Sequence, residues 1–168
     1  PEGPPLEVIV AVSGPDSAVT VRRKAKRMGI WVNTDSVIVD SAPSFYAIAT
    51  SDTLDNTISK LDDFRHLISV ERSIHISDNP FNINDPREFT DALIRIREKS
   101  GLYKRLENTV KLAQDTLFET RIALPANLTE GDYRTRILLT RGGQVTSEYE
   151  TVINVQKVGL ERWIFNLA

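Results

Sequence analysis

The chain has no cysteine in its 168 residues. Disulfides, zinc sites built from thiolates and a cysteine nucleophile are therefore excluded. There are only two histidines, His66 and His75. Neither has a second histidine at metal-ligand spacing, so we expect no metal site and a solvated ring for each. No apolar run reaches the roughly eighteen residues that a membrane-spanning helix requires, and no charged leader followed by an apolar run opens the chain.

The motifs of the common enzyme classes are missing as well. The sequence contains no G-x-S-x-G elbow, no P-loop and no dinucleotide fingerprint. Carboxylate pairs such as Asp62 with Asp63 occur, but on an acidic surface their proximity says little about catalysis. We therefore assign no catalytic residue, no metal and no cofactor. The formal net charge of −2 gives no overall attraction to nucleic acid, so we expect no nucleic-acid partner.

What is present describes an ordinary globular protein. Hydrophobic residues make up 40% of the chain and charged residues 26%, which is enough apolar area to offset chain entropy. The length is within the usual range for one domain, so we predict a single domain over residues 1–168. The chain begins at Pro1 without a methionine and ends on an apolar run. We therefore expect it to be a piece of a longer protein.

Alternating apolar residues at both ends of the chain indicate β-strands. They predict strands over residues 6–12, 18–24, 29–33, 37–39 and 45–50, and again over 118–124, 133–139 and 145–155. Gly142 and Gly143 predict a tight hairpin turn before the last strand. No helical period separates the early strands, which argues against a βαβ sheet. The expected fold is mainly β, an immunoglobulin-like antiparallel β-sandwich with strands at about 6–50 and 117–156.

Between the two blocks the apolar spacing changes to three and four residues, which predicts a helical insertion over about 54–113. Within it we expect a helix at about 54–68, a short strand at 70–77, a loop at 77–85, a helix between Asp85 and Gly101 and a further helical piece at about 102–110. A short helix at about 159–167 is expected to close the chain.

Local signals support two of these features. Asp85 is a suitable N-cap, with Pro86 and Glu88 following it as in a capping box, and Gly101 lies where a left-handed C-cap belongs. The buried stripe of this helix is predicted to be Phe89, Leu93 and Ile96. Residues 128–133 resemble the tyrosine corner of immunoglobulin-like domains, in which a tyrosine hydroxyl, here that of Tyr133, bonds back to upstream backbone.

A basic cluster is the main candidate for a binding site. Five cations occupy six positions: Arg22, Arg23, Lys24, Lys26 and Arg27. Arginine forks suit phosphate, sulfate, sulfite or an acidic partner. The simpler interpretation is a solvated strand end whose cations are neutralised by nearby carboxylates. Strand alternation separates Arg23 from Arg22 and Lys24, which weakens a compact site.

Trp31 and Asn33 are predicted to lie on the same side of their strand. Together they would form a ligand shelf of indole and amide. We favour core packing for Trp31 instead, because immunoglobulin-like cores commonly use a tryptophan as a central packing residue.

Several segments form a distinctive set: VTVRRK, GIWVN, PSFYA, GLY, the corner LP-x-N-L-x-x-G-x-Y and the closing VGLER-x-I. Together they resemble a family of alphaproteobacterial transmembrane proteins of unknown function. The resemblance covers nearly the whole chain. It implies a secretion signal, an extracytoplasmic domain in the periplasm and one C-terminal helix in the inner membrane, outside residues 1–168. It also implies an association with permeases that resemble sulfite exporters, and it supplies no activity.

The C-terminus agrees with that resemblance. Arg162, Trp163 and Phe165, on an apolar run, are typical of an interfacial anchor before a spanning helix. The alternative is a helix docked on the sandwich.

Two function classes follow. The first is a non-catalytic extracytoplasmic binding domain that meets a permease-like membrane protein or senses a small oxyanion such as sulfate or sulfite. The second is an enzyme whose site is assembled from residues distant in sequence.

Overall fold

The computed structural model of the chain describes residues 3–76, 87–113 and 117–157. The strands are β1 Leu6–Ser13, β2 Asp16–Arg27, β3 Ile30–Pro43, β4 Tyr46–Thr50, β5 Tyr103–Leu106, β6 Lys111–Ala113, β7 Leu117–Glu119, β8 Gly131–Arg141 and β9 Gln144–Val155. The helices are α1 Leu54–Thr57, α2 Lys60–His66, the 3-10 helix η1 Val70–Ser73 and α3 Arg87–Lys99. The predicted N-cap Asp85 and the predicted helix at 159–167, with Arg162, Trp163 and Phe165, lie outside the described residues.

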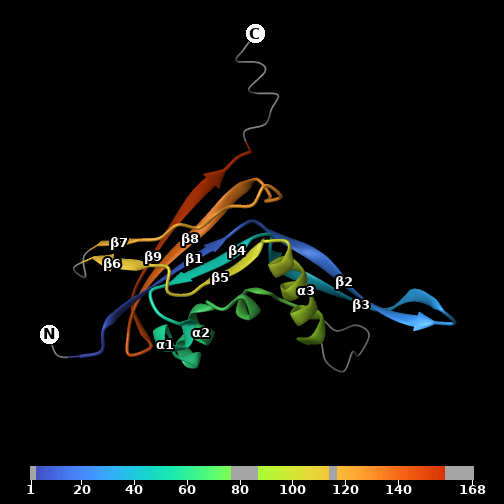
Figure 1. The fold of residues 1–168 in the computed structure, drawn as a ribbon, viewed down its shortest axis with the longest axis horizontal. Coiled ribbons are helices and arrows are strands. Elements are labelled where there is room, and N and C mark those ends of the chain that lie inside the picture. Colours follow the sequence, from blue (N-terminus) through green and yellow to red (C-terminus); the bar gives the residue numbers. More distant parts are fainter. Residues whose placement is uncertain (1–2, 77–86, 114–116, 158–168) are drawn as a thin grey trace, which may run out of the picture.

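The body of the protein is one five-stranded sheet in the order β5-β4-β1-β8-β9 (Figure 1). Strands from both ends of the chain therefore meet in the same sheet, since β1 pairs antiparallel with β4 on one side and with β8 on the other. The β8–β9 hairpin turns at Gly142 and Gly143, whose φ angles of 57° and 79° are those of the predicted tight turn.

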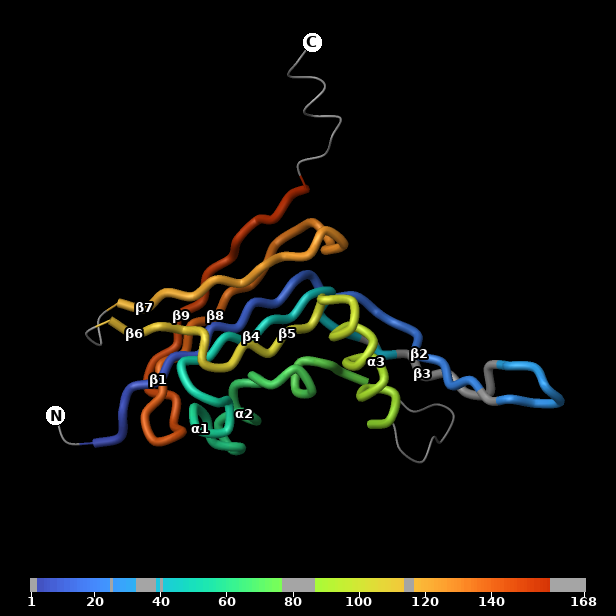
Figure 2. The backbone as a smooth tube through the Cα atoms, viewed as in Figure 1, coloured from blue at the N-terminus to red at the C-terminus, as the bar shows by residue number. Residues whose placement is uncertain are grey.

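The β2–β3 hairpin leaves the sheet and extends away from it beyond α3 (Figures 1 and 2). The sequence predicted two strands, 29–33 and 37–39, with a turn between them. That prediction was wrong, because Ile30–Pro43 is one strand paired with β2 along its length. The chain turns instead at Met28 and Gly29, where φ is 51° and 82°. Turn-forming residues stay in β3 because a continuous partner strand overrides local preference.

The helices cover one face of the sheet, but the single helix predicted at 54–68 was wrong. Ile58 is extended, with φ −139°, and the chain starts a second helix immediately afterwards. Thr53 and Ser59 each accept a hydrogen bond from a backbone N–H three residues on, so each caps its own short helix. The strand predicted at 70–77 is replaced by η1 and a single bridge between Ser41 and His75.

The predicted C-cap at Gly101 is confirmed. Gly101 has φ 76°, and the N–H groups of Gly101 and Leu102 donate to the carbonyl oxygens of Glu98 and Arg97, the pattern of a Schellman motif. Phe89 and Leu93 are buried as predicted, whereas Ile96 is exposed and Ile94 takes its place. The helical piece predicted at 102–110 was wrong, because Tyr103–Leu106 is a strand parallel to β4. The edge of β4 supplies backbone hydrogen-bond partners to this segment, and the spacing of its apolar residues cannot indicate such a distant partner.

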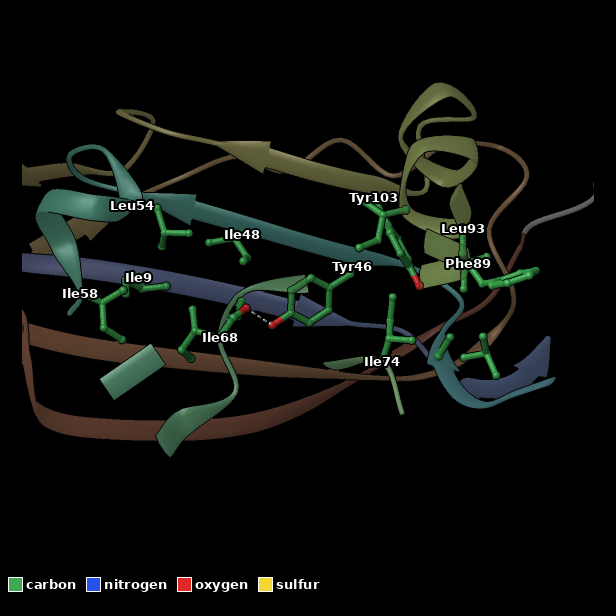
Figure 3. Packing of buried hydrophobic residues seen from close by; sticks show 14 of the residues in the cluster. Ile9, Tyr46, Ile48, Leu54, Ile58, Ile68, Ile74, Phe89, Leu93 and Tyr103 are labelled. Carbon is green, nitrogen blue, oxygen red and sulfur yellow. Dashed lines mark hydrogen bonds between the residues drawn. The ribbon is translucent and has the colours of Figure 1, made fainter. Parts of the chain in front are cut away.

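Apolar residues are buried on both faces of the sheet. On the helical face, Ile9, Tyr46 and Ile48 pack against Ile68 and Leu93 (Figure 3). On the opposite face, Val8 and Val10 contact side chains from the β6–β7 hairpin and the segment after it. The fold is mainly β, as expected. The immunoglobulin-like sandwich is not confirmed, because among the described residues helices cover one face of the sheet, and a short hairpin with the segment after it covers the other.

The tyrosine corner is confirmed in its local geometry. The hydroxyl of Tyr133 donates to the carbonyl oxygen of Thr129 at 2.6 Å. The ring of Tyr133 packs against Phe45 with centroids 5.9 Å apart. The strand predicted at 118–124 is shorter than expected, since β7 covers only Leu117–Glu119.

Candidate functional site

The predicted basic cluster is divided between two places. Arg22, Arg23 and Lys24 line a groove of about 420 Å³ between β2 and α3. Lys26 and Arg27 lie farther along the hairpin, next to the turn at Met28. The structure therefore does not bring the five cations together.

Inside that groove Arg23 has partners on α3. Its guanidinium is ion-paired with Glu88 and lies over the ring of Phe89, 5.3 Å from the centroid. This is the neutralisation that the simpler interpretation of the cluster describes. Asp91 also lines the groove, so carboxylates oppose the cations there.

Trp31 is not a core residue, so the favoured core interpretation was wrong. Its exposed fraction is 67%, because the part of β3 that carries it lies on the projecting hairpin and not in the sheet. Trp31 pairs across the hairpin with Lys26, and Asn33 pairs with Lys24. The side chain of Asn33 lies outside the described part of the chain.

A second hollow, which we call the arginine cleft, has a volume of about 340 Å³. It lies on the helical face of the sheet, where α2 and η1 approach the ends of β1 and β4. Both histidines of the chain line it, together with residues far from them in sequence such as Asp16, Arg136 and Glu148. Its titratable lining residues are Asp16, Tyr46, Arg65, His66, His75, Arg134, Arg136 and Glu148.

The floor of the arginine cleft is set by strand register. Ser13 of β1 is directly opposite Tyr46 of β4 and Arg134 of β8. Residues that face each other across antiparallel strands share one face of the sheet, so these side chains form a row. Arg136 lies two residues beyond Arg134 and thus on the same face.

Arg136 is the buried cation of this site, with an exposed fraction of 8%. Its guanidinium donates to the carbonyl oxygen of His66 at 2.5 Å, to that of Leu67 at 2.9 Å and to the Tyr46 hydroxyl at 3.3 Å. No carboxylate within residues 3–76, 87–113 and 117–157 forms an ion pair with it. A buried charge held by neutral partners leaves a positive potential in the cleft.

Tyr46 links the sheet to the segment after α2. Its hydroxyl donates to the carbonyl oxygen of Ile68 at 2.5 Å (Figure 3). Burial raises the pKa of Tyr46, and the nearby Arg136 guanidinium opposes that rise in part. The phenol therefore stays protonated at neutral pH and acts as a hydrogen-bond donor.

Side chains at the rim are partly paired. His66 Nδ1 lies 3.2 Å from Glu148 Oε2, so this ring is not the freely solvated one we expected. Arg134 forms a 2.7 Å ion pair with Glu150, and Arg65 lies 3.7 Å from Asp62. Asp16 accepts a hydrogen bond from the Ser41 hydroxyl at 3.0 Å.

Arg136 is the cation of the lining that favours an anion. Of the three lining arginines, Arg65 and Arg134 have Asp62 and Glu150 beside them, whereas no described carboxylate forms an ion pair with Arg136. In the part of the chain that the structure describes, no group of histidine and acidic residues is arranged to hold a metal ion. A histidine that is hydrogen-bonded to a serine or threonine hydroxyl can activate that hydroxyl as a nucleophile. Within the same residues neither histidine side chain forms such a bond.

Sequence reasoning missed the arginine cleft because the alternation over residues 133–139 favours Tyr133, Thr135, Ile137 and Leu139 as the inward face of their strand. That choice put Arg134 and Arg136 on a face expected to be in water. Leu138 and Thr140 share that second face, and both are fully buried. Their presence was the available signal that β8 is covered on both sides.

No helix among the described residues combines the length and the apolar character needed to cross a bilayer. No curated protein matches the chain significantly, and no solved structure does so either. The model of one family, described as "Putative transmembrane protein (Alph_Pro_TM)", matches residues 1–168. The chain belongs to this transmembrane protein family.

Proposed function

We propose that the chain is a non-catalytic binding domain and that it takes a small anion, of the sulfate or sulfite class, in the arginine cleft. This proposal rests on the buried Arg136, whose charge lacks a carboxylate partner among the described residues. Arg136 lines the arginine cleft together with Arg65 and Arg134. Guanidinium groups bind oxyanions through paired N–H donors.

The size of the cleft supports a small ligand. Its volume of about 340 Å³ is near the lower end of the range for small-molecule sites, about 300 to 1,000 Å³. Three N–H groups of Arg136 already donate to protein acceptors. A guanidinium has five, so two remain for a ligand among the described surroundings.

The cellular setting is part of the same proposal. Membership of a transmembrane protein family supports a domain that works at a membrane. We place it on the periplasmic side of the inner membrane, next to one spanning helix. A membrane protein such as a permease is the proposed partner, with the domain as its accessory.

A thermal unfolding experiment tests the anion site. Sulfate, sulfite and phosphate at millimolar concentration, with chloride at matched ionic strength, are added to the protein and the Tm is measured. A ligand present at a hundred times its Kd stabilises the folded state by about 2.7 kcal/mol, which is a rise of several degrees for a chain of this length. We expect one of the oxyanions to produce this rise and chloride not to.

Two variants locate the site. Arg65→Gln combined with Arg134→Gln removes two rim cations and is expected to reduce the rise by at least half. Arg22→Gln alters the other basic groove, between β2 and α3, and is expected to leave the rise intact. No oxyanion effect in the wild type contradicts the proposal. Loss of the effect in Arg22→Gln alone would move the site to the other groove.

A further inference from the structure

The β2–β3 hairpin ends in a projecting segment, residues 26–32, which we call the arm tip (Figure 2). Lys26 pairs with Trp31 and Arg27 pairs with Ile30 across it. Directly opposed residues share a face of a hairpin, and neighbouring pairs alternate. Each face of the arm tip therefore carries one cation beside one large apolar side chain.

The apolar side chains of the arm tip are exposed. Met28 is fully exposed, and the exposed fractions of Ile30 and Trp31 are 66% and 67%. Val32 continues the series with partial exposure. Single exposed apolar residues are ordinary, but a contiguous set at the end of a projecting hairpin marks an interaction site.

The backbone of the turn supports this conclusion independently. Met28 has φ 51° and Gly29 has φ 82°, the combination of a type I′ turn that asparagine followed by glycine favours. A side chain without a local hydrogen bond is unfavourable in the left-handed region. Methionine at this position costs hairpin stability while placing an apolar side chain at the apex, so the needs of the turn do not explain it.

Charge around the arm tip has one sign. No aspartate or glutamate occurs between Asp16 and Asp35. Lys24, Lys26 and Arg27 are exposed immediately behind the apex. Met28 thus lies at the apex, Arg27 and Lys26 lie level with Ile30 and Trp31 on opposite faces, and Lys24 lies farther back.

We infer that the arm tip inserts end-on into the interfacial region of an anionic lipid bilayer. A bilayer presents phosphates outside and hydrocarbon inside, which suits an apolar apex flanked by cations on long flexible stems. Lysine and arginine stems reach back to the phosphates while the apex is buried. A groove on a protein would select one face of a hairpin, whereas both faces here have the same character. The inference does not depend on the anion proposed for the arginine cleft.

Tryptophan fluorescence tests the insertion directly, because the chain has two tryptophans. Trp163→Phe leaves Trp31 as the reporter, and Trp31→Phe leaves Trp163. The full chain is mixed with vesicles of phosphatidylglycerol and phosphatidylcholine in equal parts, or with phosphatidylcholine alone. We expect the Trp31 emission to shift to the blue, and brominated acyl chains to quench it, with the anionic vesicles only. A Trp31 spectrum that vesicles leave unchanged overturns the inference.

Substitutions separate insertion from folding. Met28→Asn supplies the residue that the turn prefers, so we expect an unchanged or higher Tm together with about tenfold weaker vesicle binding in co-sedimentation. Lys24, Lys26 and Arg27 together replaced by glutamine are expected to weaken binding on the order of a hundredfold, at about fivefold per cation.

The matched control replaces three exposed lysines elsewhere by glutamine: Lys60, Lys99 and Lys111. It changes the net charge equally and is expected to keep most of the binding. Equal losses in the two triple variants would mean attraction by overall charge and would overturn the inference. So would full vesicle binding by Met28→Asn, in which case the arm tip is a surface for another protein.

Discussion

Replacement of Arg136 by methionine tests how the sheet and the helical layer are held together. The guanidinium joins β8 to the C-terminal end of α2 through the carbonyl oxygens of His66 and Leu67. Methionine keeps a long apolar stem that packs in the same space and donates nothing. The substitution therefore removes these bonds and leaves two carbonyl groups without their donor.

The magnitude follows from the kind of bond lost. A hydrogen bond from a charged donor contributes about 1.5 to 3 kcal/mol, so two of them contribute about 3 to 6 kcal/mol. Removing the charge recovers part of the cost of burying it, and that recovery is incomplete because Arg136 faces a hollow open to water. We expect a net loss of about 2 to 3 kcal/mol, a sizeable share of the roughly 5 to 15 kcal/mol of a typical domain.

Urea unfolding at equilibrium measures this loss as a lower midpoint with an unchanged slope. The matched control is Arg134→Met, on the same face of the same strand, whose side chain is 55% exposed and paired with Glu150. An exposed pair contributes about 0 to 1 kcal/mol. Should the two variants unfold within about 0.5 kcal/mol of each other, the role given to the buried guanidinium would be refuted.

Other predictions use the same measurement. Gly143→Ala is expected to cost about 1 to 3 kcal/mol, because its Cβ would lie 3.1 Å from the Ser59 backbone nitrogen. Gly29→Ala, at a similar φ in open space, should cost less, and the reverse order contradicts this reading. Tyr133→Phe loses the 2.6 Å bond of the corner and should cost about 1 kcal/mol; a neutral effect would mean that the bond is dispensable. Burial raises the pKa of Tyr46 above its ordinary value of 10.0. The protein therefore keeps its full stability below that pH and loses stability as the pH rises further, because Tyr46 is deprotonated more easily in the unfolded chain than in the folded one. Urea midpoints across alkaline pH check this, and Tyr46→Phe should flatten the fall.

Local signals predicted local features well. Gly101, Tyr133 and the pair Gly142 and Gly143 each take the conformation that the sequence indicated. In each case the physical cause is contained within a few residues, as a φ angle that glycine allows or a hydroxyl four residues from its acceptor. Such features need no knowledge of distant partners.

Features that depend on a distant partner were missed. Residues 103–106 form a strand only because β4 offers its edge, and the turn residues within β3 remain extended because β2 continues beside them. Distant partners also explain why the candidate site differs from the predicted one. The cluster at residues 22–27 was visible as a run of cations, yet the structure divides it between a groove and the arm tip.

The amino-acid sequence alone determines that the chain is mainly β, that it turns at particular glycines and that it carries cations at residues 22–27. These features depend on composition, on the alternation of apolar residues and on the backbone conformations that each residue prefers, all of which act over short distances. Only the tertiary structure decided that Arg136 would be buried beside His66 and Tyr46, and that Trp31 would be exposed on an arm. Strand alternation places a side chain on one of two faces, but whether that face meets water or another layer depends on residues about seventy positions away in the chain.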